Sequence, residues 1–115
     1  MDIYYKTKKL KKKLDNPREM VKEWGSEQAK KLMRRLNEIK SVDCLADLYD
    51  LPAVKCHQLS NNRDNQFAVT LKEPYRLIFE PYHEEEPVPL KADGGFDTSR
   101  ISSILIIEVV DYHGT

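Results

Sequence analysis

The spacing of hydrophobic residues changes once along the chain, close to Pro52. Before Pro52, apolar residues recur every three or four positions, which is the spacing of helices with one buried face. After Pro52, apolar and polar residues alternate, which is typical of strands that bury one face. The pattern therefore predicts an α+β fold, in which an N-terminal strand and helices pack on a mainly antiparallel, twisted sheet.

Two helices are predicted in the first half of the chain. Asn16 is a suitable N-cap, Pro17 suits the first helical position, and Gly25 is a typical stop signal. Ser26 is expected to cap the second helix. The apolar residues of that helix keep an amphipathic spacing: Ala29, Leu32, Met33, Leu36 and Ile39. A short helical turn is expected within 41–48, whereas 6–15 has too little apolar surface to be assigned.

Five segments are predicted to be strands: 1–5, 54–59, 66–71, 75–80 and 101–112. A polar turn at 60–65 and a tight reversal at 72–74 favour antiparallel neighbours. The last strand is the most apolar segment, so we expect it inside the sheet. Residues 81–100 contain three prolines, adjacent glycines and an acidic run, which predicts a long, mobile connection. No internal repeat is present, and we expect residues 1–115 to form a single domain.

Composition favours a soluble cytoplasmic protein. The chain has 115 residues, of which 40% are hydrophobic and 33% charged, and its formal net charge is zero. No stretch approaches the ~20 apolar residues that span a bilayer, and lysines interrupt the N-terminus from Lys6 onward, so we expect neither a membrane segment nor a signal peptide. Cys44 and Cys56 are too few for a disulfide framework, so we expect reduced thiols packed in the core.

The charge is unevenly distributed. Residues 6–40 carry thirteen Lys and Arg against five Asp and Glu, a net charge of +8, whereas residues 41–115 carry six against thirteen, a net charge of −7. A basic block on helices is typical of nucleic-acid contacts, and a merely solvated helical face is the other interpretation. The positions are Lys8, Lys9, Lys11, Lys12 and Lys13, followed by Lys30, Lys31, Arg34 and Arg35.

Polar residues in the strands are the candidates for chemistry. They are His57, Arg76, Asp111, Tyr112 and His113. Regular alternation places Asp111 and His113 on the face shared by Leu105, Ile107 and Val109, with Tyr112 on the other, although twist at the strand end can bring all three to one cleft. Structural interpretations stay open: His57 as a hydrogen-bonded strand residue, and Arg76 as the partner of Asp111 or Glu80. His83, beside three glutamates, is expected to be solvated.

This set of side chains matches what metal-free cleavage of RNA requires. One group takes the proton of the 2′-hydroxyl, another protonates the leaving 5′-oxygen, and a cation stabilises the charged phosphorane. A metal site built from His57, His113 and the two cysteines lacks the usual ligand spacings, so we expect no metal. A serine hydrolase is disfavoured because no Gly-x-Ser-x-Gly motif is present.

Four stretches resemble a known family: "LPAVKCHQL" at 51–59, "YRLIFEP" at 75–81, "DGGFD" at 93–97 and "ISSILIIEVVDYH" at 101–113. They are similar to the HigB group, the plasmid-maintenance killer proteins, within the RelE/ParE toxin superfamily. The resemblance covers nearly the whole chain, and its most specific part is the arginine-aliphatic-phenylalanine strand followed by the C-terminal Asp-Tyr-His. It implies a compact RelE/ParE-like fold.

The resemblance implies the toxin of a type II toxin–antitoxin system, a cytoplasmic, ribosome-dependent mRNA endoribonuclease that inhibits translation without a cofactor. The implied partners are a HigA-like helix-turn-helix antitoxin, the ribosome with its mRNA, and operator DNA only through the antitoxin. His57, Asp111, Tyr112 and His113 match the active-site positions of the group, and Arg76 matches the arginine that stabilises the phosphate. The implied base is His113 or Asp111, His57 is the leaving-group acid or positions the mRNA, and Tyr112 stacks on a base. The basic helices then contact ribosomal RNA.

One departure from the group is visible. Several relatives carry a lysine three residues after the strand histidine, where this chain has Ser60, and the nearest cation downstream is Arg63. Either Arg63 replaces that lysine as an RNA contact, or cleavage is weaker. Two other functions remain open. One is a non-enzymatic, ParE-like inhibitor of DNA gyrase, against which the retained set of His57, Arg76 and Asp111-Tyr112-His113 argues. The other is a degenerate toxin that serves only as antitoxin partner and co-repressor, and Ser60 is its only support.

Overall fold

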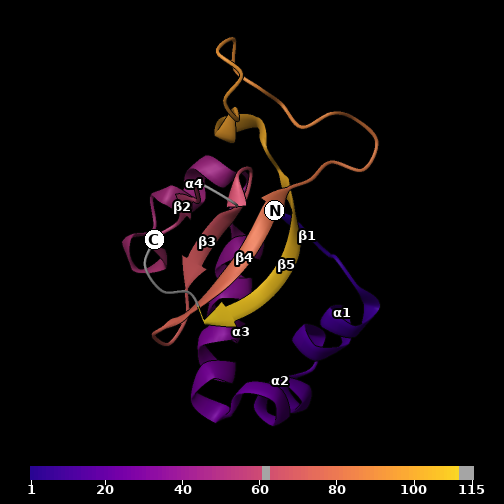
Figure 1. Cartoon of the computed structure of the whole chain (residues 1–115), viewed down its shortest axis with the longest axis vertical. Helices are drawn as coiled ribbons and strands as arrows, with labels where there is room; N and C mark the ends of the chain where they lie inside the picture. Colours follow the sequence, from indigo (N-terminus) through magenta and orange to yellow (C-terminus); the bar gives the residue numbers. More distant parts are fainter. Residues whose placement is uncertain (61–62, 112–115) are drawn as a thin grey trace.

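Helices cover one face of a five-stranded mixed sheet in the computed structural model, which describes residues 1–60 and 63–111 (Figure 1). The strand order is β1-β5-β4-β3-β2, with β1 parallel to β5 and the other neighbours antiparallel. The predicted α+β class with a mainly antiparallel sheet is therefore confirmed. The strands are β1 (Asp2–Tyr5), β2 (His57–Gln58), β3 (Phe67–Thr70), β4 (Tyr75–Pro81) and β5 (Ser103–Asp111).

The helices follow the sequence signals with two differences. Asn16 caps α2 (Pro17–Trp24) by accepting a hydrogen bond from the Arg18 amide at 2.9 Å. Gly25, at φ 85°, ends α2 and is also the N-cap of α3 (Ser26–Ser41), so the expected Ser26 cap is wrong. The unassigned 6–15 segment contains α1 (Lys8–Asp15), capped by Thr7, and the expected short turn is α4 (Leu45–Tyr49).

The sheet differs from prediction at its β2 edge. Only His57–Gln58 pairs with β3, because residues before it form a 3-10 turn, η1 (Pro52–Val54), and Lys55 adopts a left-handed conformation at φ 51°. The placement of β5 inside the sheet is confirmed along Ser103–Ile106, where it lies between β1 and β4. Its remaining residues, up to Asp111, pair only with β4.

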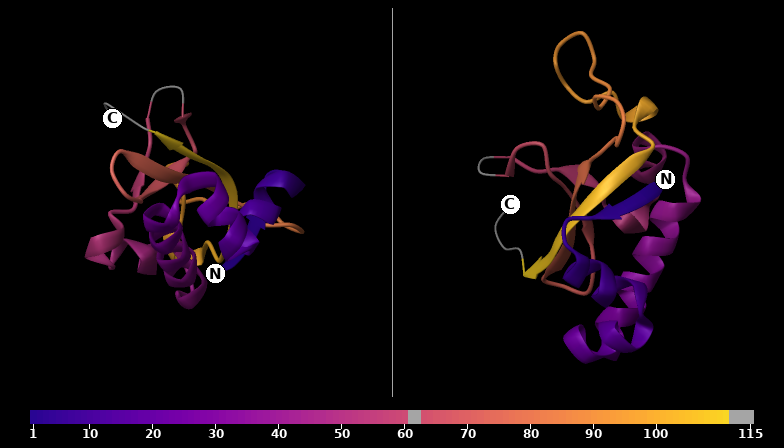
Figure 2. Two further views of the ribbon diagram at one scale, coloured as in Figure 1. Left: turned by 90° about the horizontal axis from the view of Figure 1, so that it is seen from below. Right: turned by 90° about the vertical axis from the view of Figure 1, so that its right-hand side faces the viewer.

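One main core lies between the sheet and the helices. Fully buried side chains of α3, α4 and the sheet meet there, and Phe67 stacks on Phe79 with ring centroids 5.7 Å apart. No helix among the described residues combines the length and apolarity that a membrane crossing needs. Figure 2 shows that the helices lie on one side of the sheet.

The connection between β4 and β5 projects beyond one end of the sheet (Figures 1 and 2). It begins one residue later than predicted, because Pro81 still belongs to β4. A bridge between Leu90 and Phe96 closes its tip, and a 3-10 turn, η3 (Thr98–Arg100), precedes β5. Phe96 anchors the connection by packing on Phe67 at 5.7 Å between ring centroids.

Candidate functional site

The face of the sheet opposite the helices, here called the outer face, carries most of the predicted site. The strand register gives one row of neighbouring residues from β2 to β5: His57, Ala68, Ile78 and Glu108. A second row contains Thr70, Arg76 and Val110. Residues paired in register project from the same side of a sheet. His57 and Arg76 therefore share the outer face, with their Cα atoms about 12 Å apart by strand geometry.

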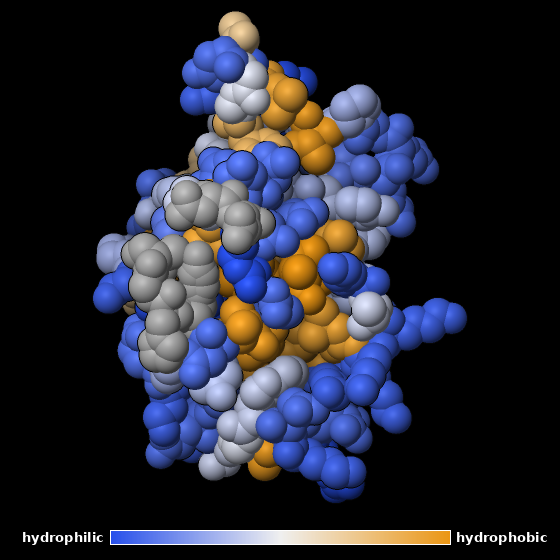
Figure 3. Space-filling view, viewed as in Figure 1, coloured by the Kyte–Doolittle hydropathy of each residue, from blue (hydrophilic) through white to orange (hydrophobic). Residues whose placement is uncertain are grey.

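The middle of the outer face is apolar. Leu59, Ala68 and Ile78 are buried there, and Ile107 and Val110 pack against them. Figure 3 views the molecule from this side, where apolar surface is interrupted and surrounded by hydrophilic side chains. Charged groups on such a surface are partly dehydrated, which strengthens their interaction with an incoming phosphate.

His57 is half-buried on the edge strand. Its Nδ1 lies 3.1 Å from the carbonyl oxygen of Lys55. A carbonyl only accepts, so Nδ1 carries the proton, and Nε2 is the nitrogen that accepts a proton in the neutral ring and donates one in the charged ring. Lys55, the residue that supplies this carbonyl, adopts a left-handed conformation at φ 51°. The structural interpretation and the catalytic one are thus compatible, because one nitrogen anchors the ring and the other remains for chemistry.

Arg76 is held near its own turn. Its Nη1 donates to the carbonyl of Tyr75 at 2.9 Å and pairs with the exposed Glu73 carboxylate at 3.1 Å. The sequence-based alternatives, pairing with Asp111 or Glu80, are not what the structure contains; Glu80 accepts from Gln66 instead, at 3.1 Å. A guanidinium has five N–H donors, and these contacts occupy one nitrogen. The remaining fork suits a phosphate.

Arg63 crosses from the β2–β3 connection to the far side of the outer face. Its guanidinium donates to Glu108 on β5 at 2.9 Å and to Gln66 at 3.1 Å. This places the cation on the same face as His57 and Arg76. The network of Gln66, Glu80 and Glu108 was not predicted from the sequence, although all three occupy polar positions in alternating strands.

By register, Asp111 lies on the helix-covered face of the sheet, not on the outer face with His57 and Arg76. It pairs with Tyr75, whose side chain packs against the main core, and not with the Arg76 row. The expected grouping of Asp111 with Leu105 and Ile107 is wrong, because a register shift opposite Ile78 and Phe79 adds one residue to β5. Val109 and Asp111 consequently share the helix-facing side, whereas Ile107 packs on the outer face. Tyr112 and His113 lie outside the described residues.

The predicted basic surface divides into two parts. Lys9 and Lys13 of α1 border a cleft with Ile107, Glu108 and Val109 of β5, so α1 lies beside the outer face. Two of its lysines already have partners, since Lys11 pairs with Asp15 at 2.6 Å and Lys13 pairs with Glu23. The exposed α3 cations Lys30 and Arg34 instead face away from the sheet, because the apolar stripe of α3 packs on the helix-covered side. The exposed members are Lys8, Lys9, Lys11, Lys12, Lys30 and Arg34, with Lys31 half-buried.

Arg35 is a correction to the predicted RNA contacts. Its side chain is only 5% exposed, and its Nε donates to the carbonyl of Thr70 at 2.7 Å. Nη2 donates to the carbonyl of Ala53 at 3.0 Å, and Nη1 pairs with Glu38 at 2.7 Å. Arg35 therefore joins α3 to η1 and β3. Arg35 lies in a largely polar stretch of α3, two residues before Asn37, and only the tertiary structure shows that its side chain is buried.

His83 is a second correction, because its side chain is 8% exposed instead of solvated. Nε2 accepts from the Ser102 amide at 3.3 Å and Nδ1 faces Glu86 at 3.5 Å, so the histidine holds the start of the long connection against the residue before β5. Within residues 1–60 and 63–111, no three His, Cys, Asp or Glu side chains are grouped as metal ligands. Cys56 is buried, and burial raises the pKa of its thiol to about 12, as expected of a packed core residue.

The described part of the outer face therefore brings one imidazole and two guanidinium groups together. His57 supplies a proton donor or acceptor at Nε2, while Arg76 and Arg63 supply positive charge from two sides of an apolar floor. Comparison with known proteins adds no identity: the chain matches no protein-family model, and a search of curated proteins finds no match.

Proposed function

We propose that this chain is a metal-free endoribonuclease that cuts mRNA on the ribosome, as the toxin of a type II toxin–antitoxin system. One observation carries the proposal: His57 and Arg76, which lie nineteen positions apart in the sequence, project from the same helix-free face of the sheet. That face has an apolar floor and a second arginine, Arg63. Acid–base chemistry on a phosphodiester needs this combination of a titratable ring and fixed positive charge.

Few protein groups take part in the proposed cleavage. The 2′-oxygen loses its proton to a base and attacks the adjacent phosphorus, and the bond from phosphorus to the 5′-oxygen breaks. The products are a 2′,3′-cyclic phosphate and a 5′-hydroxyl. In this scheme the Nε2–H of His57 protonates the leaving 5′-oxygen, while its Nδ1–H remains on the carbonyl of Lys55. Arg76 stabilises the additional negative charge that develops on the phosphorane oxygens, which goes from one in the diester to two in the phosphorane. The proposed base is His113 or Asp111; by register Asp111 lies on the face opposite to His57 and Arg76, and His113 lies outside the described residues.

The proposal extends to the fold family and partners. An α+β domain with helices on one face of a mixed sheet is compatible with a RelE/ParE-like toxin. A HigA-like antitoxin then holds the toxin inactive and carries it to operator DNA, and the cytoplasm is the site of action. Lys9 of α1 lines the cleft beside Ile107 and Glu108, and Lys8 and Lys12 are exposed on the same helix, so these lysines suit the ribosomal RNA that surrounds a decoded message.

The test is to express the chain in bacteria without a partner and to map mRNA 5′ ends after induction. Growth arrest together with new, discrete 5′-hydroxyl ends in translated messages is expected. Arg76→Ala and His57→Gln should each abolish most of the cuts, whereas Arg100→Ala, which alters an exposed cation in η3, should leave them unchanged. Circular dichroism on the purified variants shows that they remain folded.

Other outcomes separate the alternatives. Arrest without new mRNA ends, accompanied by DNA cleavage complexes, identifies a gyrase inhibitor of the ParE type. Normal growth with wild-type chain identifies a degenerate toxin. Purified protein should cut naked RNA poorly, because the ribosome orders the substrate; equal rates on naked and translated RNA contradict ribosome dependence.

A further inference from the structure

A second cavity lies at the end of the sheet that the long connection covers. This cleft of about 460 Å³ lies between β2, the end of β4 and the tip of the connection. Its lining residues are Gln58, Asn65, Glu80, Pro81, Val88, Leu90, Gly94, Gly95 and Phe96. None of the candidate catalytic residues belongs to this set. Gln58 is nevertheless the immediate neighbour of His57 on β2, and Glu80 lies on the same strand as Arg76.

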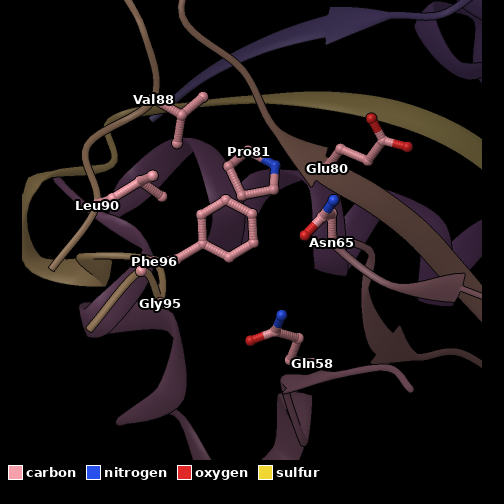
Figure 4. Close-up of a pocket in the computed structure, with 9 residues that line it drawn as sticks. Gln58, Asn65, Glu80, Pro81, Val88, Leu90, Gly95 and Phe96 are labelled. Carbon is pink, nitrogen blue, oxygen red and sulfur yellow. The ribbon is translucent and has the colours of Figure 1, made fainter. Parts of the chain in front are cut away.

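The chemistry of the cleft suits a flat, uncharged ring. Figure 4 shows the ring of Phe96 in the middle of the view, with Pro81 on one side and the side-chain amides of Gln58 and Asn65 around the other. The Phe96 ring contacts the Phe67 ring in a tilted arrangement, with 53° between the ring planes, and this contact fixes the position of the aromatic wall. Among the described lining residues there is no basic side chain, and Glu80 is acidic, so the cleft itself disfavours a phosphate.

The two amides are the groups that can read a bound ring. Gln58 and Asn65 are exposed, and neither side-chain amide has a hydrogen-bond partner within the described part of the chain. Each offers a carbonyl acceptor and two N–H donors, the arrangement that pairs with the edge of a nucleobase. At the rim, Gly94 adopts the left-handed φ of 89° that favours glycine, and the space where a Cβ would stand is open.

The geometry points to a nucleobase subsite: the cleft binds one base of the single-stranded RNA next to the cut, stacked on Phe96 and read by Gln58 and Asn65. This inference rests on the proposed function, since it supplies the substrate. β2 is the edge strand, so its consecutive residues His57 and Gln58 project to opposite sides of the edge. An RNA strand that passes over this edge places a phosphate at the outer face and a neighbouring base in the cleft. The long connection is then a specificity element that supplies the aromatic wall.

Binding of fluorescently labelled single-stranded RNA octamers to the full-length chain tests the subsite. Phe96→Leu removes the ring and keeps an apolar side chain against Phe67, and it should weaken octamer binding about tenfold, the lower-to-middle range for loss of one stacked base. Asn65→Gly removes an amide at a residue whose φ of 72° suits glycine. Gln58→Glu replaces an amide donor by an acceptor. These two variants should change the ranking of A, C, G and U octamers by about fivefold or more. Asn37→Ala, on the exposed side of α3, is the matched amide deletion and should stay within twofold.

An abasic octamer separates base binding from phosphate binding. Wild-type protein should bind it no better than Phe96→Leu binds the complete octamer. Equal affinity of the wild type for abasic and complete RNA overturns the subsite, as does unchanged base ranking in both amide variants. Asn65→Gly and Gln58→Glu alter exposed side chains, so they decide the question if Phe96→Leu unfolds.

Mapping the cut sites distinguishes failure of the subsite from failure of the proposed function. If the wild type cuts messages and the three variants cut beside the same bases at the same frequencies, the endonuclease stands and the subsite is wrong. If RNA octamers bind through Phe96 but the wild type makes no cuts in translated messages, the cleft binds RNA and the endonuclease proposal is wrong.

Discussion

The two faces of the sheet use arginine in opposite ways. On the helix-covered side, Arg35 is buried and all three of its guanidinium nitrogens are hydrogen-bonded to protein groups. On the outer face, Arg76 uses one nitrogen, for its own turn and an exposed glutamate. A guanidinium whose nitrogens are all hydrogen-bonded to protein groups stabilises the fold, whereas N–H donors without a protein acceptor can bind a ligand. The contrast teaches that the charge of a residue says little about its role until its partners are known.

The same contrast holds for apolar groups. The main core joins α1–α4 to the sheet with many fully buried side chains, whereas Leu59, Ala68 and Ile78 alone form the buried cluster of the outer face within the described residues. Substitutions on the helix-covered side of the sheet should therefore mainly remove packing and lower stability, whereas substitutions on the outer face are expected to lower activity. The predictions below separate these two consequences.

The largest expected effect is on stability, from Arg35→Ala. Removal of the guanidinium leaves the carbonyls of Thr70 and Ala53 without their donor and leaves Glu38 without its partner, which should cost about 3–5 kcal/mol of unfolding free energy. Urea denaturation measures it. Arg34→Ala, the exposed neighbour on α3, is the control and should change stability by no more than about 0.5 kcal/mol. A loss below 1 kcal/mol for Arg35→Ala contradicts the structural role.

The second effect is on catalysis, from Arg76→Ala. Loss of the phosphate-stabilising cation should raise the barrier to cleavage by about 2–4 kcal/mol. Arg76→Lys should recover part of it, because lysine keeps the charge but not the planar fork. Cleavage of a message in a reconstituted translation system measures both, with unfolding curves as the control. Equal rates for wild type and Arg76→Ala at equal stability remove this arginine from the site.

The third effect concerns alkaline pH and the core side. Burial raises the pKa of Cys56 from 9.0 to about 12, so above pH 9 the unfolded chain loses this proton while the folded chain retains it. Stability is then fully present below pH 9 and falls as pH rises toward 12, by about 1.4 kcal/mol at pH 10 from this thiol. Tyr5 and Tyr49 contribute in the same direction between pH 10 and 12, because burial raises the pKa of each to about 12.

Cys56→Ala isolates the contribution of the thiol. The difference in unfolding free energy between wild type and variant should be smaller at pH 10 than at pH 8, since the variant has no thiol to titrate. A difference that is constant between these two pH values shows that the thiol does not cause the alkaline loss.

The smallest effect comes from Glu108→Gln on the outer face. The substitution weakens the ion pair with Arg63. The side chain of Arg63 is 29% exposed and that of Glu108 is 41% exposed, so the unfolding free energy should change by only about 0.5 kcal/mol. RNA affinity should rise, and the slope of its logarithm against the logarithm of salt should steepen by up to about one, the contribution of one additional phosphate contact. Glu85→Gln, an exposed change in the long connection, is the control. Weaker RNA binding by Glu108→Gln indicates that Arg63 needs this partner for its position.

Local signals predicted most of the architecture but not the partners of single side chains. Asn16, Pro17 and Gly25 determine where α2 begins and ends through contacts within a few residues, so they are readable from the chain. The period-two pattern likewise gave β3, β4 and β5. Arg35 and His83 were misassigned because their partners, the Thr70 carbonyl and the Ser102 amide, lie 35 and 19 positions away. α1 was missed because it has few apolar residues, and packing of Leu14 supports it.

The candidate site was predicted in part for the same reason. His57 and Arg76 were expected on one sheet, and the register brings them to one face. The face of Asp111 could not be predicted, because nothing in the local sequence marks the register shift in β5. The cleft beside Phe96 could not be predicted from the sequence either, because its lining residues come from three separate segments: β2, β4 and the long connection.

At the register shift, β5 contains one residue more than β4, and this extra residue affects the shape of the sheet. Ile106 and Glu108 lie opposite the adjacent residues Phe79 and Ile78, so Ile107 has no counterpart on β4. A chain without Ile107 would keep every other β5 side chain on its present side and would form an unbroken ladder. What it would lose is the local bend and added coil that an unmatched residue imposes on its strand. Ile107 therefore bends β5 where it crosses the outer face, and a chain without it would present Arg76 and Glu108 on a flatter sheet.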